Sequence, residues 1–146
     1  MLSDITLGQL VDRIGVALGL GFPSGKELET LSEHTNNFSK IKITGTDKIN
    51  ISGFENIAKK MINDGFSREE VASYVYSVIS KVIEKMLQSR QDLSLPVLFS
   101  GGVSGSKRVQ NSVKHMCLPM FSEPDLSSDN AVGIALLTKE KFEKVN

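Results

Sequence analysis

The stretch Leu95-Pro96-Val97-Leu98-Phe99-Ser100-Gly101-Gly102-Val103-Ser104-Gly105-Ser106 decides the fold class of this chain. Its first half is a short, continuous apolar run, which is typical of a strand buried on both faces in a parallel sheet. Glycines interleaved with small residues follow, and a helix is expected from there to about His115. A strand, a glycine-rich turn and a helix in this order predict an α/β fold.

Helical periodicity accounts for most of the remaining sequence. Apolar residues recur at helical spacing from Leu7 to Leu18, and Ser67 with Glu70 forms a capping box that starts a long helix. That helix carries two apolar stripes, so it should pack on two sides. Helices are expected over residues 7–18, 26–32, 53–63, 67–89 and about 129–137, and short strands over 41–44 and 118–121. The sequence therefore predicts a single α/β domain over residues 1–146, helix-rich with a small sheet.

The composition limits the classes of function. The chain has 146 residues, 40% of them hydrophobic and 23% charged, as in an ordinary globular domain. Seventeen basic and seventeen acidic residues cancel to a net charge of zero, which argues against a broad nucleic-acid-binding surface. The single cysteine, Cys117, excludes an intramolecular disulfide. The sequence has no membrane-length apolar run and no signal-peptide pattern, so we expect a cytoplasmic protein without a membrane partner.

The glycine-rich residues 100–106 form the first candidate site. Glycine lets the backbone approach a ligand closely, and the N-terminus of the following helix offers free amides and a partial positive charge. That combination suits a nucleotide. The spacing fits neither the P-loop nor the dinucleotide-binding fingerprint. From local sequence alone, a tight strand-to-helix turn explains these residues at least as well.

Two groups of acidic residues are further candidates. Asp4, Gly8 and Asp12 are expected on one side of the opening helix, at the border of its apolar stripe. Two carboxylates beside a glycine can bind ribose hydroxyls or a metal, or simply form a solvated helix edge. Asp129 can cap a helix or bind a metal, but one carboxylate is too few to make a metal site.

Five short motifs occur along nearly the whole chain in a family-specific order. They are Asp4–Arg13, Leu18–Gly25, Ile51–Phe54, Ser100–Val103 and Ser128–Ala131. Together they resemble the C-terminal lobe of the TsaD/Gcp/YgjD family, the tRNA threonylcarbamoyladenosine synthase subunits once labelled O-sialoglycoprotein endopeptidases. Each motif is short, and their order makes the resemblance specific.

The resemblance implies a fold, a reaction and a set of ligand contacts. The fold is that of an RNase H-like, actin-like ATPase (ASKHA) lobe, one of two lobes that close on a nucleotide. The reaction is transfer of threonylcarbamoyl from its adenylate to an adenosine of tRNA. The implied contacts to ATP or threonylcarbamoyl-adenylate are Asp12, Gly25, Glu29, Gly101, Gly102 and Ser106. The implied ligand of a divalent metal (iron, zinc or magnesium) is Asp129.

The sequence also departs from the family pattern. Ser106 stands where the family has an asparagine, and the HxxxH metal motif and phosphate loop of the N-terminal lobe are absent from this chain. We therefore expect the chain alone to be inactive and to bind nucleotide and metal only with the missing N-terminal lobe. Other implied partners are a TsaB-like paralogue or kinase-like proteins, and tRNA in the full enzyme. The uncovered apolar surface could drive homo-oligomer formation. The alternative is a non-catalytic, standalone lobe that serves as a protein-interaction or scaffold module.

Overall fold

The computed structural model describes residues 2–35, 41, 43, 48–89 and 94–122. Asp129 and the helix expected over 129–137 lie outside the described residues, as do Lys42 and Thr44 of the expected strand 41–44. The elements, in chain order, are β1 (Leu2–Ser3), α1 (Leu7–Ala17), α2 (Gly25–Ser32), β2 (Lys48–Ile49), α3 (Ile51–Asn63), α4 (Arg68–Gln88), β3 (Val97–Phe99), the 3-10 helix η1 (Gly102–Gly105), α5 (Lys107–Val113) and β4 (Pro119–Phe121).

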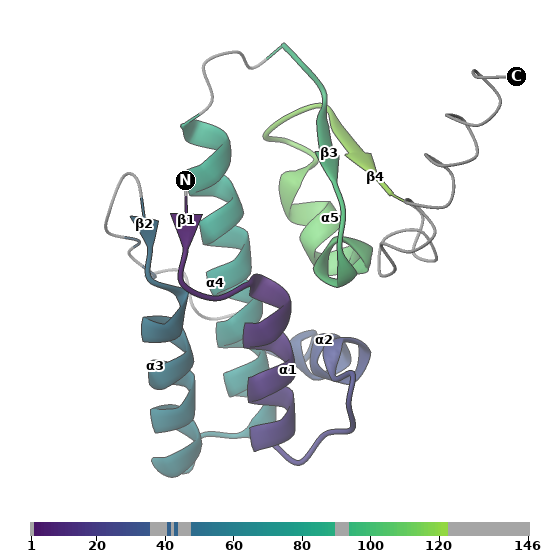
Figure 1. Cartoon of the computed structure of the whole chain (residues 1–146). Helices are drawn as coiled ribbons and strands as arrows, with labels where there is room; N and C mark the ends of the chain where they lie inside the picture. Colours follow the sequence, from purple (N-terminus) through teal and green to yellow (C-terminus); the bar gives the residue numbers. More distant parts are fainter. Residues whose placement is uncertain (1, 36–40, 42, 44–47, 90–93, 123–146) are drawn as a thin grey trace, which may run out of the picture.

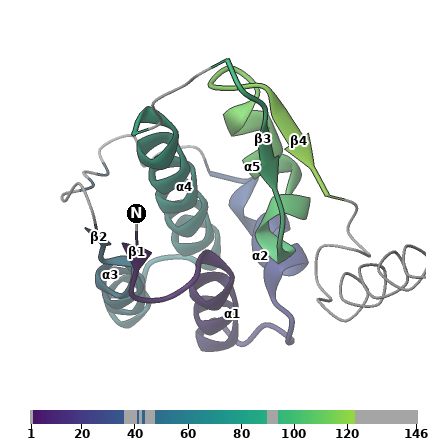
Figure 2. The same cartoon turned by 45° about the horizontal axis from the view of Figure 1, so that its top comes forward.

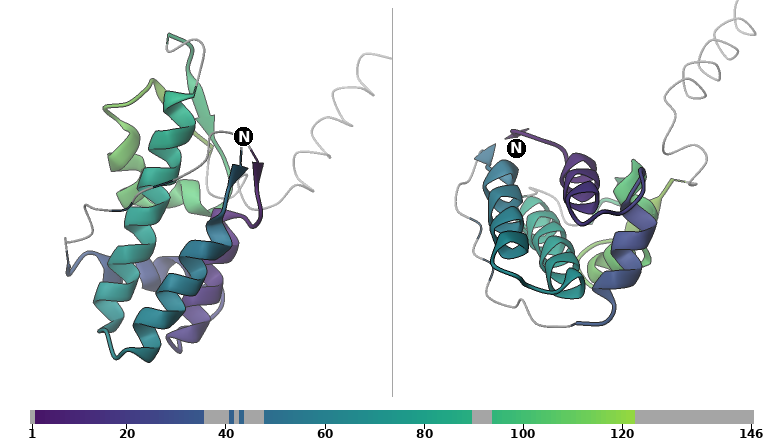
Figure 3. Two further views of the ribbon diagram at one scale, coloured as in Figure 1. Left: turned by 90° about the vertical axis from the view of Figure 1, so that its left-hand side faces the viewer. Right: turned by 90° about the horizontal axis from the view of Figure 1, so that it is seen from below.

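Helix α4 is the central element, and α1, α2, α3 and α5 lie around it (Figures 1 and 3). Both predicted apolar stripes are buried, which confirms that the helix packs on two sides. The buried residues of the two stripes are Val71, Val75, Val78 and Val82, and Tyr76, Ile79, Ile83 and Leu87. Met86 continues the spacing of the first stripe at the C-terminal end of the helix but is 45% exposed.

The strands among the described residues form two separate two-stranded parallel sheets on either side of the C-terminal half of α4 (Figures 1 and 2). In one sheet β1 pairs with β2, and in the other β3 pairs with β4, with Leu98 opposite Met120. The predicted strand at 95–100 and its parallel pairing are confirmed. The prediction that it is buried on both faces is wrong, because Leu98 is 66% exposed. A continuous apolar run predicts two covered faces only when elements are present to cover both.

Capping interactions fix where the helices begin. Thr6 and Gln9 form a capping box in which the Gln9 amide donates to Thr6 Oγ1 at 3.1 Å and the Thr6 amide donates to Gln9 Oε1 at 3.0 Å. Helix α1 therefore starts at Leu7, and the expectation that Asp4 lies on this helix is wrong. The predicted box of Ser67 and Glu70 is confirmed at the start of α4.

In the part of the chain that the structure describes, no helix is both long and apolar enough to span a bilayer. Ile41 and Ile43 are described and do not lie in a strand. The division of residues 1–146 into one domain stays a prediction.

Candidate nucleotide site

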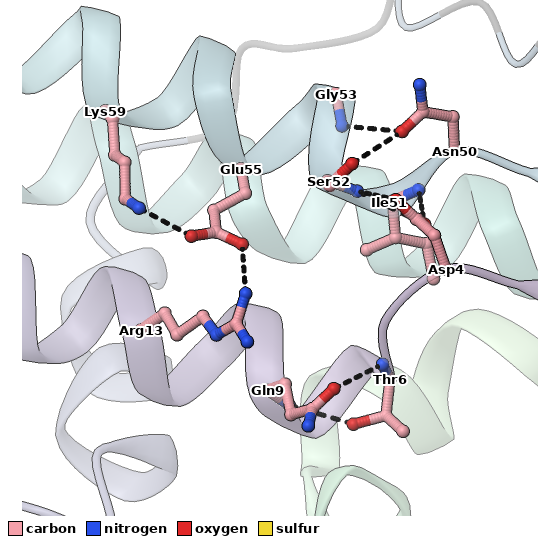
Figure 4. Close-up of polar contacts among 10 residues, drawn as sticks. All are labelled: Asp4, Thr6, Gln9, Arg13, Asn50, Ile51, Ser52, Gly53, Glu55 and Lys59. Atoms are coloured by element: carbon pink, nitrogen blue, oxygen red, sulfur yellow. Dashed lines mark hydrogen bonds and ion pairs between the residues drawn. The ribbon is translucent and has the colours of Figure 1, made fainter.

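Asp4 is a helix cap and not a partner of Asp12. One carboxylate oxygen of Asp4 accepts from the Ile51 amide at 2.7 Å, and the other accepts from the Ser52 amide at 3.1 Å, at the first turn of α3 (Figure 4). Hydrogen bonding by Ser52 and by the Ile51 amide lowers the pKa of Asp4 to about 2. The helix N-terminus favours this negative charge. The predicted pairing of Asp4 with Asp12 is thus replaced by a link between the N-terminal segment and α3.

The buried carboxylate of Glu55, on α3, joins this helix to α1. Glu55 is 4% exposed, and its two oxygens meet Arg13 at 3.0 Å and Lys59 at 2.6 Å (Figure 4). The hydrogen bond from Lys59, followed by that from Arg13, lowers the pKa of Glu55 despite its burial. Because a buried charge is costly unless it is paired, this cluster fixes the position of α1 against α3.

Asp12 holds the turn between α1 and α2. Its Oδ1 accepts from the Ser24 amide at 3.0 Å, and Ser24 Oγ donates to the Gly21 carbonyl at 2.7 Å. Ser24 is fully buried and lies so close to Gly15 that a Cβ there would be 2.1 Å from the Ser24 Cβ. The close approach requires glycine at position 15. Asp12 and Gly25, both predicted site residues, are therefore brought to the same turn.

Gly25 is held from the other side by α4. The Tyr76 hydroxyl donates to the Gly25 carbonyl at 3.0 Å. Burial, with a smaller contribution from the Glu29 charge, raises the pKa of Tyr76 well above its usual range. The phenol consequently stays protonated as a donor. The helical periodicity of α4 explains why the ring of Tyr76 is buried, whereas the contact of its hydroxyl group with Gly25 could not be predicted from the local sequence.

Glu29 and Ser106, two more predicted site residues, contact each other directly. Glu29 Oε1 accepts from Ser106 Oγ at 2.8 Å and from the Arg108 amide at 2.9 Å. Ser106 Oγ in turn accepts from the Val109 amide at 3.2 Å, which makes Ser106 the N-cap of α5. One carboxylate oxygen thus joins α2 to the end of the glycine-rich segment, 77 residues away in sequence.

Arg108 reinforces the same junction, and sequence reasoning missed it. Its guanidinium donates to the Ser32 carbonyl at the end of α2 and to Ser73 Oγ on α4 at 3.4 Å. Burial lowers the pKa of Arg108, although its ordinary value is high enough that the group stays charged. The polar cluster therefore consists of Asp12, Ser24, Gly25, Glu29, Tyr76, Ser106 and Arg108, where α1, α2, α4 and α5 meet.

Gly101 and Gly102 lie beside a hollow and not within this cluster. Gly101 has φ of +101°, a conformation that glycine adopts without strain, and a Cβ at Gly102 would meet no atom within 4 Å. Both line a hollow of about 500 Å³, together with Gly8, Leu7 and residues of β2, α3 and α4. Asp12, Gly25, Glu29 and Ser106 do not line it. The predicted site is thus divided into a polar cluster and an open glycine turn, joined through η1.

The described residues include no group of side chains that is suited to bind a metal ion. Within 2–35, 41, 43, 48–89 and 94–122, no three His, Cys, Asp or Glu side chains come together in a way that could hold one. Asp129 lies outside these ranges. Three or more converging ligands are the rule for a bound divalent cation. No step is therefore assigned to a metal from this structure.

Fold and sequence together identify the family. The class is a helix-rich α/β protein with small parallel sheets. The sequence model of the TsaD family, described as tRNA N6-adenosine threonylcarbamoyltransferase, matches residues 2–136. Since this match covers far more than half of the sequence, the chain belongs to the TsaD family.

Curated relatives agree with this assignment. A tRNA N6-adenosine threonylcarbamoyltransferase of Thermus thermophilus is 28% identical over 97% of this chain and 46% of its own length. One of Archaeoglobus fulgidus is 29% identical over 90% of this chain and 43% of its own. A probable bifunctional tRNA threonylcarbamoyladenosine biosynthesis protein of Methanothermobacter thermautotrophicus is 28% identical over 92% of this chain and 27% of its own. The chain thus spans slightly less than half of the length of the Thermus thermophilus and Archaeoglobus fulgidus proteins, as expected of one lobe.

Proposed function

We propose that the chain is the C-terminal lobe of a TsaD-like tRNA threonylcarbamoyladenosine transferase and carries half of its nucleotide site. The observation that carries the proposal is the polar cluster. Glu29 and Ser106, 77 positions apart, are joined by a direct hydrogen bond, and Asp12 accepts from the amide of Ser24, the residue before Gly25. Family membership supports the reaction, and the proposed fold is an actin-like ATPase (ASKHA) lobe.

In this proposal the two carboxylates recognise the nucleoside. The bonds to Ser24 and to Ser106 each use one oxygen, Oδ1 of Asp12 and Oε1 of Glu29. The second oxygen of each would accept from a ribose hydroxyl of ATP or threonylcarbamoyl-adenylate. Gly101 and Gly102 would let the ligand approach the backbone. Positioning of the adenylate against tRNA is then the lobe's contribution to the rate.

In this proposal, the part of the protein that this chain lacks supplies the remaining ligand contacts. We propose that it brings the phosphate contacts and the histidine ligands of a divalent metal, which Asp129 would complete. When bound, such a metal polarises the group to be transferred. Further proposed partners are a TsaB-like paralogue or kinase-like proteins, and we place the protein in the cytoplasm.

The test uses a chimera in which residues 2–136 replace the matched region of the Thermus thermophilus relative. It is expressed in cells lacking their own enzyme, and threonylcarbamoyladenosine is quantified in tRNA by mass spectrometry. We expect modification with the chimera and none with either half alone. Asp12→Ala should lower it at least ~10-fold, which corresponds to about 1.4 kcal/mol. Asp64→Ala, an exposed aspartate after α3, is the matched control.

A conservative variant separates recognition from folding. Asp12→Asn keeps an oxygen that can accept from the Ser24 amide and removes the charge. If Asp12→Asn restores full modification, Asp12 acts through the turn and not through the ligand. A folded chimera without any modification would contradict the proposed transferase.

One observation favours the alternative of a non-catalytic interaction module. The three polar residues that resemble ligand contacts, Asp12, Glu29 and Ser106, all take part in bonds that hold helices together. A module that only binds proteins would keep these bonds without a nucleotide. The chimera decides between the two, because a scaffold module does not modify tRNA.

A further inference from the structure

Ser24 is a serine at the N-cap position of α2 whose hydroxyl does not cap the helix. It is fully buried, and its side chain makes no capping bond to α2. The hydroxyl donates instead to the Gly21 carbonyl at 2.7 Å, within the turn that joins α1 to α2. A serine at an N-cap usually accepts from an amide in the first turn of its helix, so this side chain has another role.

The side chain of Ser24 lies directly on the backbone of α1 at Gly15. A Cβ at position 15 would be 2.1 Å from the Ser24 Cβ and 2.4 Å from its Oγ, but 3.6 Å from its Cα. The side chain of Ser24 therefore fills the space that a side chain at position 15 would take. The Leu20 amide also donates to the Gly15 carbonyl, at 2.9 Å, which brings the turn back to the same point of α1. Because protein interiors are closely packed, this contact sets the distance between the turn and α1.

The backbone of Ser24 holds Asp12. Its amide donates to Asp12 Oδ1 at 3.0 Å, and its carbonyl accepts from the Leu28 amide at 2.9 Å in the first turn of α2. The amide, the carbonyl and the hydroxyl of Ser24 are thus all bonded within the protein, and the residue is fully buried. Ser24 is therefore unable to contact a ligand itself, and it can act on one only through Asp12.

We infer that Ser24 is a positioning residue for recognition of the ribose. Its side chain, packed between Gly15 and Gly21, holds the turn amide where it bonds to Asp12 Oδ1, so the direction of the second carboxylate oxygen is set before the ligand binds. Ordering a free side chain on binding lowers the affinity by a factor of roughly 2 to 12, and a carboxylate that is already ordered avoids this loss. This role rests on the proposed function, in which Asp12 accepts from a ribose hydroxyl.

Binding of ATP and of 2′,3′-dideoxy-ATP by the chimera described above, measured by calorimetry, separates positioning from folding. Ser24→Gly removes the side chain and keeps the amide. It should weaken ATP binding at least ~3-fold and change the affinity for the dideoxy analogue by less than about 1.5-fold, because that nucleotide has no ribose hydroxyl to donate to Asp12. Equal losses for the two nucleotides would indicate a general distortion of the site and overturn this role.

A matched control removes a similar hydroxyl elsewhere. Ser112 Oγ donates to the carbonyl of Val109, three residues earlier, at 2.7 Å, which is the spacing and the length of the bond from Ser24 to Gly21. Ser112→Ala should leave the affinities for both nucleotides unchanged. If Ser112→Ala lowered the affinity for ATP as much as Ser24→Gly, the effect at Ser24 would not be specific and its positioning role would be overturned.

The effect of Ser24 should depend on Asp12. In a chimera that carries Asp12→Ala, adding Ser24→Gly should lower the affinity for ATP by less than about 1.5-fold, since no carboxylate remains to be positioned. An undiminished loss in that background would show that Ser24 acts by another route. A chimera that does not bind ATP at all overturns the proposed function together with this role. A chimera that binds ATP equally well with and without the Ser24 side chain overturns the role of Ser24 alone.

A second substitution at the same contact should rescue the loss. Gly15→Ala alone should raise the unfolding equilibrium constant of the chain at least ~5-fold in urea, because its Cβ would lie 2.1 Å from the Ser24 Cβ. In the Ser24→Gly background the nearest remaining atom is the Cα of position 24 at 3.6 Å, an ordinary contact, so Gly15→Ala should raise it less than about twofold there. The double variant of the chimera should also bind ATP within about twofold of wild type, because the new Cβ again separates the turn from α1. A stable double variant that binds ATP as weakly as Ser24→Gly would overturn the positioning role of this contact.

Discussion

Replacing Ser106 with alanine tests the junction at the centre of the polar cluster. The hydroxyl of Ser106 accepts from the Val109 amide at 3.2 Å and donates to Glu29 Oε1 at 2.8 Å. Loss of an N-cap costs about 0.5–2 kcal/mol, and loss of a hydrogen bond to a charged acceptor about 1.5–3 kcal/mol. The Arg108 amide still satisfies Glu29, which keeps the total near the low end, about 2 kcal/mol. In a chain of this size that lowers the melting temperature by about 4–10 °C.

The assay is thermal and urea unfolding followed by circular dichroism. Ser112→Ala on the same helix is the control, because its hydroxyl donates only to the Val109 carbonyl within the helix. It should cost less than about 0.5 kcal/mol. Ser106→Asn, which restores the family's residue, should stay close to wild type, since asparagine is a good N-cap. A loss below about 0.5 kcal/mol for Ser106→Ala would refute the view that this hydroxyl holds α2 against α5.

Three further predictions concern stability. Gly15→Ala should cost about 1–3 kcal/mol or more in urea unfolding, because its Cβ would lie 2.1 Å from the Ser24 Cβ, whereas Gly8→Ala, with 3.9 Å to the nearest atom, should be tolerated. Tyr76→Phe should cost about 0.5–1.5 kcal/mol by losing the bond to the Gly25 carbonyl, and an unchanged urea midpoint would contradict that role. Glu55 has a folded pKa below its ordinary value of 4.5, so its stabilisation is present above that pH and is lost as pH falls through the folded value. Glu55→Gln should therefore be less stable than wild type at neutral pH, and the gap should narrow in acid unfolding curves below about pH 4.5.

The helices could be predicted from the sequence because their signals are local. The apolar stripes of α1 and α4 and the Ser67–Glu70 box depend on residues within a few turns of each other. The strands β1 and β2 have two residues each and pair across more than 40 positions, so no local pattern could reveal them. The exposure of Leu98 was missed for a related reason. Its apolar run predicts burial on both faces only where other elements cover both faces, and the local sequence does not show whether they do.

The site was predicted in part. The residues Asp12, Gly25, Glu29 and Ser106 came from the family resemblance, and their contacts required the fold, since Glu29 and Ser106 are 77 positions apart. Asp4 was misplaced because a small shift in the start of a helix changes which side chains cap and which lie on its face. Arg108 was missed because nothing in its local sequence shows that its guanidinium reaches α2 and α4.

Calorimetric titration with ATP measures whether this chain carries only half of a nucleotide site. Affinity depends on groups converging from both halves, so the isolated chain should show weak or no binding. The chimera with the complementary half should bind at least ~100-fold more tightly, equivalent to about 2.8 kcal/mol. Tight, metal-dependent binding of ATP by the isolated chain would contradict the proposal that half of the site is missing.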